Sequence, residues 1–364
     1  MKFKDLQPLP SRPKVAVVIL NYNSVDFLRR FLPSVVRASK AENYQIVVAD
    51  NASTDLSVAF LKENYAENSE NPIQIIELTQ NFGFAEGYNQ ALRAVEADVF
   101  VLLNSDVEVA QNWTLPLVEA MKNDATIGIG QPKILSQKEK AKFEYAGAAG
   151  GWLDVLGYPF SVGRIFATVE TDLGQYDGAP KPIFWASGAA MFIRSDVWRN
   201  LGGFDGDFFA HMEEIDFCWR AKRAGFRVVS ATDSTIYHVG GGTLDYLNPR
   251  KTFLNFRNNL SMLVKNESAA KLFWLIPVRL VLDGVAGLKF VASGDFAHCW
   301  AIVRAHFAFY AWLPSLLRKR KLVRNAIENA QIGLPNQEGI YPKSIVINYF
   351  LKGIKTFSDV KSQL

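Results

Sequence analysis

Short hydrophobic runs, each followed by a polar loop and then a helical pattern, recur along the first hundred residues. The runs are rich in β-branched residues, which is typical of strands that are buried on both faces of a parallel sheet. We therefore expect strands over residues 15–20, 44–49, 73–78 and 99–103. Strands that alternate with helices favour right-handed βαβ units, so the sequence predicts an α/β fold around a mostly parallel sheet.

Polar residues follow each of the predicted strands. Because ligands of such sheets bind beyond the carboxyl ends of the strands, these residues form a candidate recognition surface for sugar hydroxyls, base edges and phosphates. They are Asn21, Asp50, Asn51, Asn81, Gly83, Asn104 and Asp106. The alternative interpretation is that loops are polar in any protein.

The two common nucleotide-phosphate motifs are absent from the sequence. No G-x-G-x-x-G follows the first strand and no P-loop lysine is present, which disfavours nicotinamide dehydrogenases and P-loop NTPases. A bound nucleotide diphosphate would need another source of positive charge. Asp106, at the end of a buried strand, is a natural anchor for a divalent cation, because hard ions prefer carboxylate and phosphate oxygens.

A second acidic stretch begins the helical pattern that runs from Glu213 to Gly225. Glu213 and Glu214 lie in the predicted first turn, where unpaired N–H groups and the helix dipole favour negative charge. A carboxylate at such a junction suits a general base that takes a proton from a hydroxyl. Helix-end electrostatics alone is the alternative. Asp216 is placed to pair with Arg220 at i+4.

Composition adds an asymmetry of charge to this picture. The chain has 364 residues and a net charge of +4, and from Arg250 onward 17 Lys and Arg face 6 Asp and Glu, a balance of +11. Residues 1–249 therefore carry −7, and two units with different partners are expected. We predict that the first unit covers residues 1–245. A basic, helical extension follows over 246–364.

The remaining global features favour a protein of a reducing compartment. Two cysteines are too few for a disulfide framework, no signal peptide is recognisable, and no uncharged run reaches the ~18 residues that span a bilayer. We therefore expect a cytoplasmic protein that is not secreted and has no transmembrane helix.

The motifs VVILNYN, VVADNASTD, LTQNFGFAEGYNQAL, VLLNSD and GAAMFIRSDVWRNLGGFDGDFFAHMEEIDFCWR occur in this order. In order and spacing they resemble the family 2 glycosyltransferases, with the rhamnosyltransferase-like enzymes of bacterial surface-polysaccharide assembly as the most similar subgroup. The resemblance runs from about Val15 to Thr243. It implies that residues 1–245 form a GT-A catalytic domain, with a nucleotide-binding half at about 13–108 and an acceptor half at about 109–245. It also implies inverting transfer of a hexosyl or deoxyhexosyl group from a nucleotide-diphosphate sugar to an acceptor hydroxyl. A glycan or lipid-linked acceptor is expected.

The resemblance also implies roles for single residues. The donor nucleotide would be bound by Leu20, Asn21, Tyr22, Asp50, Asn51, Asn81, Gly83, Phe84, Asn104 and Ser105. Asp106 stands in the family's D-x-D element, whose first acid is Asn104 here, and His238 matches a histidine that can ligate the metal. The metal is Mg²⁺ or Mn²⁺, and an imidazole ligand favours Mn²⁺. Glu214 is the expected base, and Glu213 and Asp216 are the alternatives.

The acceptor or sugar site is expected at Trp185, Ser187, Gly188 and His211, although a buried core Trp is an equally good interpretation of Trp185. Residues 147–175, rich in Gly and aromatics, are expected to form a loop over the active site.

The C-terminal part combines apolar helices with basic clusters. In residues 271–291 the four charges Lys271, Arg279, Asp283 and Lys289 fall within ~120° of a helical wheel. A second apolar segment over 297–317 ends in Arg318-Lys-Arg-Lys321. This pattern favours peripheral attachment to an anionic membrane surface, here the inner face of the plasma membrane, over nucleic-acid binding. Packing on the catalytic domain or a dimer contact is the alternative.

Two other functions remain open at this point. A non-catalytic sugar-binding or assembly subunit would keep the same fold. A sugar nucleotidyltransferase would normally show a Gly-rich, basic loop after the first strand, which Asn21-Tyr-Asn-Ser24 is not.

Overall fold

The computed structural model describes residues 6–240 and 248–363. The predicted boundary between catalytic domain and extension, at 245/246, lies outside these residues.

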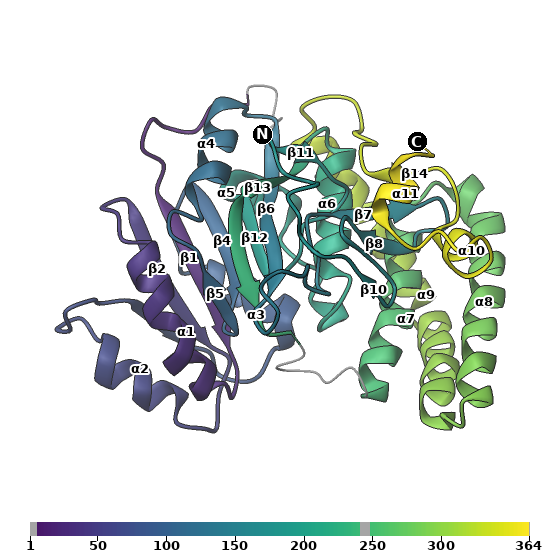
Figure 1. Cartoon of the computed structure of the whole chain (residues 1–364), viewed down its shortest axis with the longest axis horizontal. Helices are drawn as coiled ribbons and strands as arrows, with labels where there is room; N and C mark the ends of the chain where they lie inside the picture. Colours follow the sequence, from purple (N-terminus) through teal and green to yellow (C-terminus); the bar gives the residue numbers. More distant parts are fainter. Residues whose placement is uncertain (1–5, 241–247, 364) are drawn as a thin grey trace.

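A nine-stranded sheet forms the centre of the molecule (Figure 1), in the order β11-β13-β6-β12-β4-β1-β2-β3, with β5 on β13. Its strands are β1 (Val15–Asn21), β2 (Tyr44–Asp50), β3 (Gln74–Glu77), β4 (Val99–Asn104), β5 (Val107–Val109), β6 (Ile127–Ser136), β11 (Lys181–Pro182), β12 (Ala190–Arg194) and β13 (Arg227–His238). β1 to β4 are mutually parallel, β6 is parallel to β13, and β12 runs antiparallel to β4 and β6. The mostly parallel α/β sheet is therefore confirmed.

The register of the parallel strands places their polar ends at one edge. Asn21 pairs in register with Asp50, and Leu20 with Asn104. β13 runs in the same direction, since β6 and β4 both lie antiparallel to β12, so His238 ends at this edge as well.

Helices cover both faces of the sheet because each presents an apolar stripe to it. One face packs against α1 (Val25–Ala38), α2 (Ser57–Tyr65) and α4 (Leu115–Asn123). The other packs against α3 (Gly83–Leu92), α5 (Ser195–Leu201) and α6 (Glu213–Arg223). α6 buries Ile215, Cys218 and Trp219, and Gly225 follows it with a φ of 98°, as its sequence predicts.

Residues 147–175 do not form a loop over the active site as expected. They fold into β7 (Gly151–Asp154), β8 (Pro159–Ser161), β9 (Arg164–Ile165) and β10 (Thr168–Val169), which join β14 (Ile340–Tyr341) in a second sheet. An aromatic core fixes this sheet, with Trp152 5.4 Å from Phe357 between ring centroids. The segment is structural because its partner strand comes from the far end of the chain.

The C-terminal part begins with three long helices, α7 (Pro249–Asn266), α8 (Ala269–Ala292) and α9 (Phe296–Ala330), at one side of the molecule (Figure 1). Asn248, Ser268 and Asp295 cap their N-termini through side-chain oxygens. The chain then returns through β14, α10 (Ile345–Phe350) and α11 (Phe357–Lys361) to the second sheet. Within 6–240 and 248–363, every helix falls short of the length and apolarity needed to cross a bilayer.

Two of the four basic residues at 318–321 make contacts within the protein. Lys319 forms ion pairs with Asp205 and Asp207, and Arg320 donates to the carbonyl of Val264 at 2.6 Å. Of the predicted electrostatic anchor, only Arg318 and Lys321 are exposed without such a structural role.

Candidate active site

The carboxyl ends of β1 and β2 are joined by their own polar side chains. Asn21 Nδ2 donates to Asp50 Oδ1 at 2.8 Å, and Asp50 Oδ2 accepts from the backbone N–H of Ser53 at 2.8 Å. Both side chains are buried, at 0% and 2% exposure. Ser24 links this group to Ser105, with 3.0 Å between the two hydroxyl oxygens. The predicted donor residues after β1, β2 and β4 therefore form one hydrogen-bonded cluster.

A second cluster brings Asn51 to the start of α3. Asn51 Nδ2 donates to Asn81 Oδ1 at 3.1 Å and to the carbonyl of Gly83 at 3.0 Å. Gly83 has a φ of 76°, and a Cβ there would lie 2.5 Å from the Phe209 ring, so only glycine fits. Phe84 follows, with its N–H 2.7 Å from the Phe209 carbonyl.

Two further predicted donor residues border these clusters. Leu20 is half-buried against α3, where a Cβ on Gly87 would lie 2.8 Å from its Cδ2. Tyr22 is also half-buried and lies one residue beyond β1.

Asp106 and His238 meet because β5 pairs with the end of β13. Asp106 Oδ1 lies 3.2 Å from His238 Nε2, and Asn104 Nδ2 lies 3.4 Å from the same ring nitrogen. On the other side of the ring, Glu144 Oε2 lies 3.2 Å from His238 Nδ1. The two carboxylates raise the pKa of His238 to about 10 against the opposing effect of burial.

This arrangement fits a cation that is shared with a phosphorylated ligand. Asp106 and His238 offer one carboxylate and one imidazole close together, and Glu144 orients the ring from behind, as partners of metal-bound histidines do. In the described part of the chain, no three His, Cys, Asp or Glu side chains are arranged to hold a metal ion alone. The remaining ligands would therefore come from a diphosphate and water.

The first turn of α6 carries two carboxyl groups, and the backbone that leads into this turn is strained. Phe209, His211 and Met212 all have positive φ, between 65° and 76°, so the chain enters the helix through left-handed backbone. Within the described residues, neither Glu213 Oε2 nor Glu214 Oε2 has a hydrogen-bond partner, although both are buried. These two oxygens are therefore buried acceptors whose hydrogen-bonding capacity is unused by the described part of the protein.

Burial sets the protonation of these two acids. Desolvation, reinforced by the charge of Glu214, raises the pKa of Glu213 well above its ordinary value. Desolvation also raises the pKa of Glu214 to about 7, against the lowering effect of backbone N–H groups. Glu214 is half-buried and Glu213 is 3% exposed, so Glu214 is the more accessible acid, with a pKa suited to proton transfer near neutrality.

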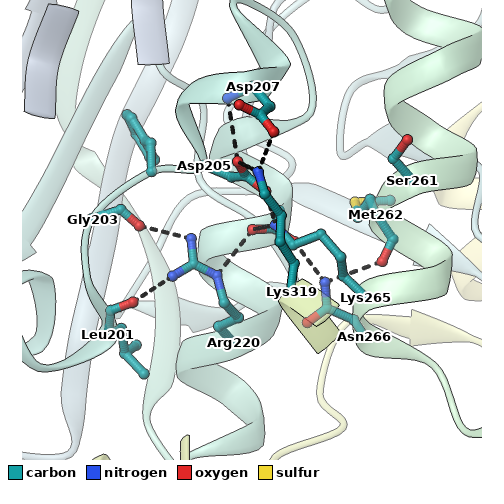
Figure 2. A network of polar contacts seen from close by, with 12 residues as sticks. Leu201, Gly203, Asp205, Asp207, Arg220, Ser261, Met262, Lys265, Asn266 and Lys319 are labelled. Atoms are coloured by element: carbon teal, nitrogen blue, oxygen red, sulfur yellow. Dashed lines mark hydrogen bonds and ion pairs between the residues drawn. The ribbon is translucent and has the colours of Figure 1, made fainter. Parts of the chain in front are cut away.

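Asp216, the third candidate base, belongs to a buried network with Arg220, Lys265 and Asn266, three residues that Figure 2 labels. Its Oδ2 pairs with Arg220 Nε and Lys265 Nζ, both at 2.9 Å, and its Oδ1 accepts from Asn266 at 2.7 Å. Arg220 also donates to the carbonyls of Leu201 and Gly203. The predicted Asp216–Arg220 pair is present. Because both oxygens of Asp216 are engaged and fully buried, it acts as a tie between α6 and α7.

Three of the four predicted sugar-site residues, Trp185, Ser187 and Gly188, lie in the segment that precedes β12, and His211 lies just before α6. Trp185 is 7% exposed and its indole N–H donates to the carbonyl of Trp152 at 2.9 Å, so its ring occupies a core position. Ser187 donates to the carbonyl of Ala146, and Gly188 packs beside the Phe84 ring. His211 is half-buried, and burial beside Lys251 lowers its pKa to about 4.

This same segment joins the two acidic groups. At one end, the N–H of Asn104 donates to the carbonyl of Ala189 at 3.1 Å, two residues before Asp106. At the other, the N–H of Ala186 donates to Cys218 Sγ at 3.4 Å, one turn beyond Glu214. The strand that leads to Asp106 and the helix that begins at Glu213 therefore both contact residues 186–189.

Two functional candidates were missed from the sequence. Glu144 lies outside every quoted motif, and only the fold brings it to His238. Asn258 of α7 donates from Nδ2 to the carbonyls of Phe208, Ala210 and His211, at 2.8 to 3.0 Å, and so holds the approach to α6. The RNN triplet at 257–259, directly before the apolar positions 260 and 262–264, was the available signal.

Two named proteins are similar in sequence to part of this chain. The O-antigen biosynthesis protein RfbC of Myxococcus xanthus is 22% identical over 65% of this chain, which spans only 18% of that protein's length. The N-acetylglucosaminyl-diphospho-decaprenol L-rhamnosyltransferase of Mycobacterium tuberculosis is 23% identical over 75% of this chain and 90% of its own length.

Solved structures share the fold. The structure of GalNAc-T7 with UDP, GalNAc and Mn²⁺ has a TM-score of 0.53 and 17% sequence identity. The match covers 70% of this chain and 48% of the GalNAc-T7 chain. S. aureus TarS residues 1–349, with UDP-GlcNAc, matches 87% of this chain and 89% of its own with a TM-score of 0.53 at 15% identity. The fold of this chain is thus of the GT-A type, with a C-terminal helical region.

A family model described as glycosyl transferase family 2 matches residues 16–196, which contain the polar strand ends and Asp106. With this match, the distant relatives and the shared fold, the chain belongs to glycosyltransferase family 2.

Proposed function

We propose that this glycosyltransferase transfers a hexosyl or deoxyhexosyl group, with inversion, from a nucleotide-diphosphate sugar to a hydroxyl of a lipid-linked or polysaccharide acceptor. The relatives named for O-antigen biosynthesis and for rhamnosyl transfer to a decaprenol-linked acceptor support a role in cell-surface glycan assembly.

Glu214 is the proposed general base. Its unpaired oxygen and a pKa near 7 suit removal of the acceptor's hydroxyl proton. The acceptor oxygen then forms its bond to the anomeric carbon as the bond from that carbon to the diphosphate oxygen breaks. One displacement from the opposite side inverts the configuration, and the proton remains on Glu214.

The donor is proposed to lie along the carboxyl edge of the sheet. Asp50 and Asn21 would contact the nucleobase, and Asn51, Asn81 and Gly83 would support the nucleotide. Asp106 and His238 would hold a divalent cation, Mg²⁺ or Mn²⁺. When bound, such an ion stabilises negative charge on the departing diphosphate as a Lewis acid.

The observation that carries this proposal is that residues 186–189 contact both the end of β4, two residues before Asp106, and α6, one turn beyond Glu214, with the donor cluster at the same sheet edge. The test is Glu214→Gln, assayed with a panel of nucleotide sugars and compared with Glu63→Gln, an exposed glutamate of α2. We expect Glu214→Gln to lose turnover by about 10²–10⁴-fold while donor binding persists. Unchanged turnover would remove Glu214 as the base, and absence of donor turnover by the wild type would favour a non-catalytic subunit.

A further inference from the structure

The outer face of α8 is largely apolar, whereas Arg279 and Asp283 point inward. On a wheel of 100° per residue, the exposed positions of α8 from Phe273 onward fall within ~160°. They are Phe273, Trp274, Pro277, Val278, Val281, Gly284, Val285, Leu288, Lys289, Val291 and Ala292. Val281 is 67% exposed and Leu288 is 69% exposed. Lys289 is the one charged member of this face, and it lies at the edge of the arc.

Two charged residues of α8 are turned into the protein. Arg279 and Asp283 are 2% and 1% exposed, and Arg279 donates to Asn259 Oδ1 at 2.6 Å. Asp283 pairs with His306 of α9 at 3.2 Å. A helix at the surface of a water-soluble protein has the opposite arrangement, with its polar side chains on the outer face. Of the four charges of the arc found in the sequence, Arg279 and Asp283 therefore mark the inner face, and Lys289 lies at its exposed border.

The start of α9 continues the apolar surface. α9 follows α8 after three residues and lies beside it at one side of the molecule (Figure 1). Phe296, Trp300, Phe307 and Tyr310 are each more than half exposed, and they recur on one side of the helix. Exposed aromatic residues in this number are costly in water but favourable at a lipid–water interface.

Basic residues border the apolar surface. Lys289 Nζ lies 5.0 Å from the ring centroid of Phe350, which puts α10 beside the end of α8. Lys352 and Lys355 follow α10 and are exposed. From Ala269 to Ala330 the chain has nine Lys and Arg against three acidic residues; Arg279 and Asp283 are buried, and Lys319 and Arg320 are engaged within the protein, which leaves six basic and two acidic residues. This charge suits an anionic surface.

We propose that the outer face of α8 and the aromatic side of α9 lie in the headgroup region of a bilayer that contains anionic lipid. The apolar side chains would enter the boundary between headgroups and acyl chains, and the bordering lysines would contact lipid phosphates. The exposed apolar face supplies the insertion and the lysines supply the charge complementarity. The proposal does not depend on the sugar chemistry.

The test is co-sedimentation of the full chain with vesicles of phosphatidylglycerol and phosphatidylcholine. The variant Val281→Asp/Leu288→Asp changes two exposed positions, and Leu56→Asp, at 64% exposure before α2, is the matched control. We expect the double variant to lose binding by at least about tenfold and the control to bind like the wild type. Vesicles of phosphatidylcholine alone should bind the wild type more weakly.

A second measurement locates the contact. Brominated lipid should quench the fluorescence of Trp300, seen as the difference between the wild type and Trp300→Phe. Equal sedimentation of wild type and double variant overturns the proposal, as does absence of wild-type binding. A third outcome also overturns the proposal: the wild type is a dimer that does not bind vesicles, and Val281→Asp/Leu288→Asp makes it monomeric. This result would assign the face to a second copy of the chain.

Discussion

Asn258 Nδ2 lies 2.8 Å from the carbonyl oxygen of His211 and holds the backbone that leads into Glu213 and Glu214. The same amide reaches the carbonyls of Phe208 and Ala210. A residue of the C-terminal helices thereby fixes the first turn of α6. We infer that Asn258 is a positioning residue for the proposed base.

Replacing Asn258 with Ala should lower kcat while leaving the affinity for the donor unchanged. The three carbonyls lose their donor, so the left-handed approach to α6 relaxes and Glu214 moves from its working position. We expect a loss of stability of about 1–3 kcal/mol. Steady-state kinetics and donor calorimetry measure the two effects separately. Equal losses in kcat and donor affinity would indicate a general structural role instead.

The rate of sugar transfer should depend on the protonation of Glu214. With a pKa of about 7, the carboxylate is ionised above that pH and protonated below it, so kcat/KM should fall as the pH drops from 8 to 6. The profile of kcat/KM against pH measures this dependence. The residual kcat/KM of Glu214→Gln should no longer fall as the pH drops. If it still falls, the pH dependence belongs to another group.

The same pKa predicts an opposite effect on stability. The folded-state pKa of Glu214 is raised above its ordinary value of 4.5, so the folded protein binds more protons, and stability falls as the pH rises from about 4.5 to about 7. Glu214→Gln removes this penalty. We expect it to raise the free energy of unfolding by about 1–3 kcal/mol at pH 8 and by much less at pH 4. Urea unfolding at the two pH values provides the measurement, with Glu63→Gln as control.

Asp216 should prove structural when it is changed to Asn. The substitution leaves Arg220 and Lys265 buried without their carboxylate, and breaking one side of such a pair costs about 3–5 kcal/mol. Urea unfolding should show this loss. At a temperature where the variant stays folded, its kcat should fall far less than that of Glu214→Gln; an equal fall would return Asp216 to the candidate bases.

Removal of divalent cations should abolish transfer if Asp106 and His238 hold the metal as proposed. Chelation followed by addition of Mn²⁺ or Mg²⁺ should restore activity in the wild type. The activity of Asp106→Asn should not recover when the metal is added, because the carboxylate of Asp106 is the stronger of the two proposed protein ligands. Calorimetry of the nucleoside diphosphate with and without Mn²⁺ gives a second readout. Full activity of the chelated wild type would exclude the metal role.

The sequence by itself determined the parallel sheet, the edge at which Asn21, Asp50 and Asn104 gather, and the pairing of Asp216 with Arg220. Each of these follows from local rules. Alternating apolar runs specify buried strands, parallel strands bring their carboxyl ends to one edge, and residues four apart meet on a helix. The family motifs lie within the same segments.

Only the tertiary structure decided which face of α8 is buried, where Glu144 lies, and that residues 147–175 form a sheet with β14. A helical wheel separates charged from apolar positions, but the inner face depends on partners such as Asn259 and His306 that lie elsewhere in the chain. Glu144 reaches His238, and β7 reaches β14, only through chain folding. Contacts between distant segments depend on how the whole chain packs, and local periodicity carries no record of that packing.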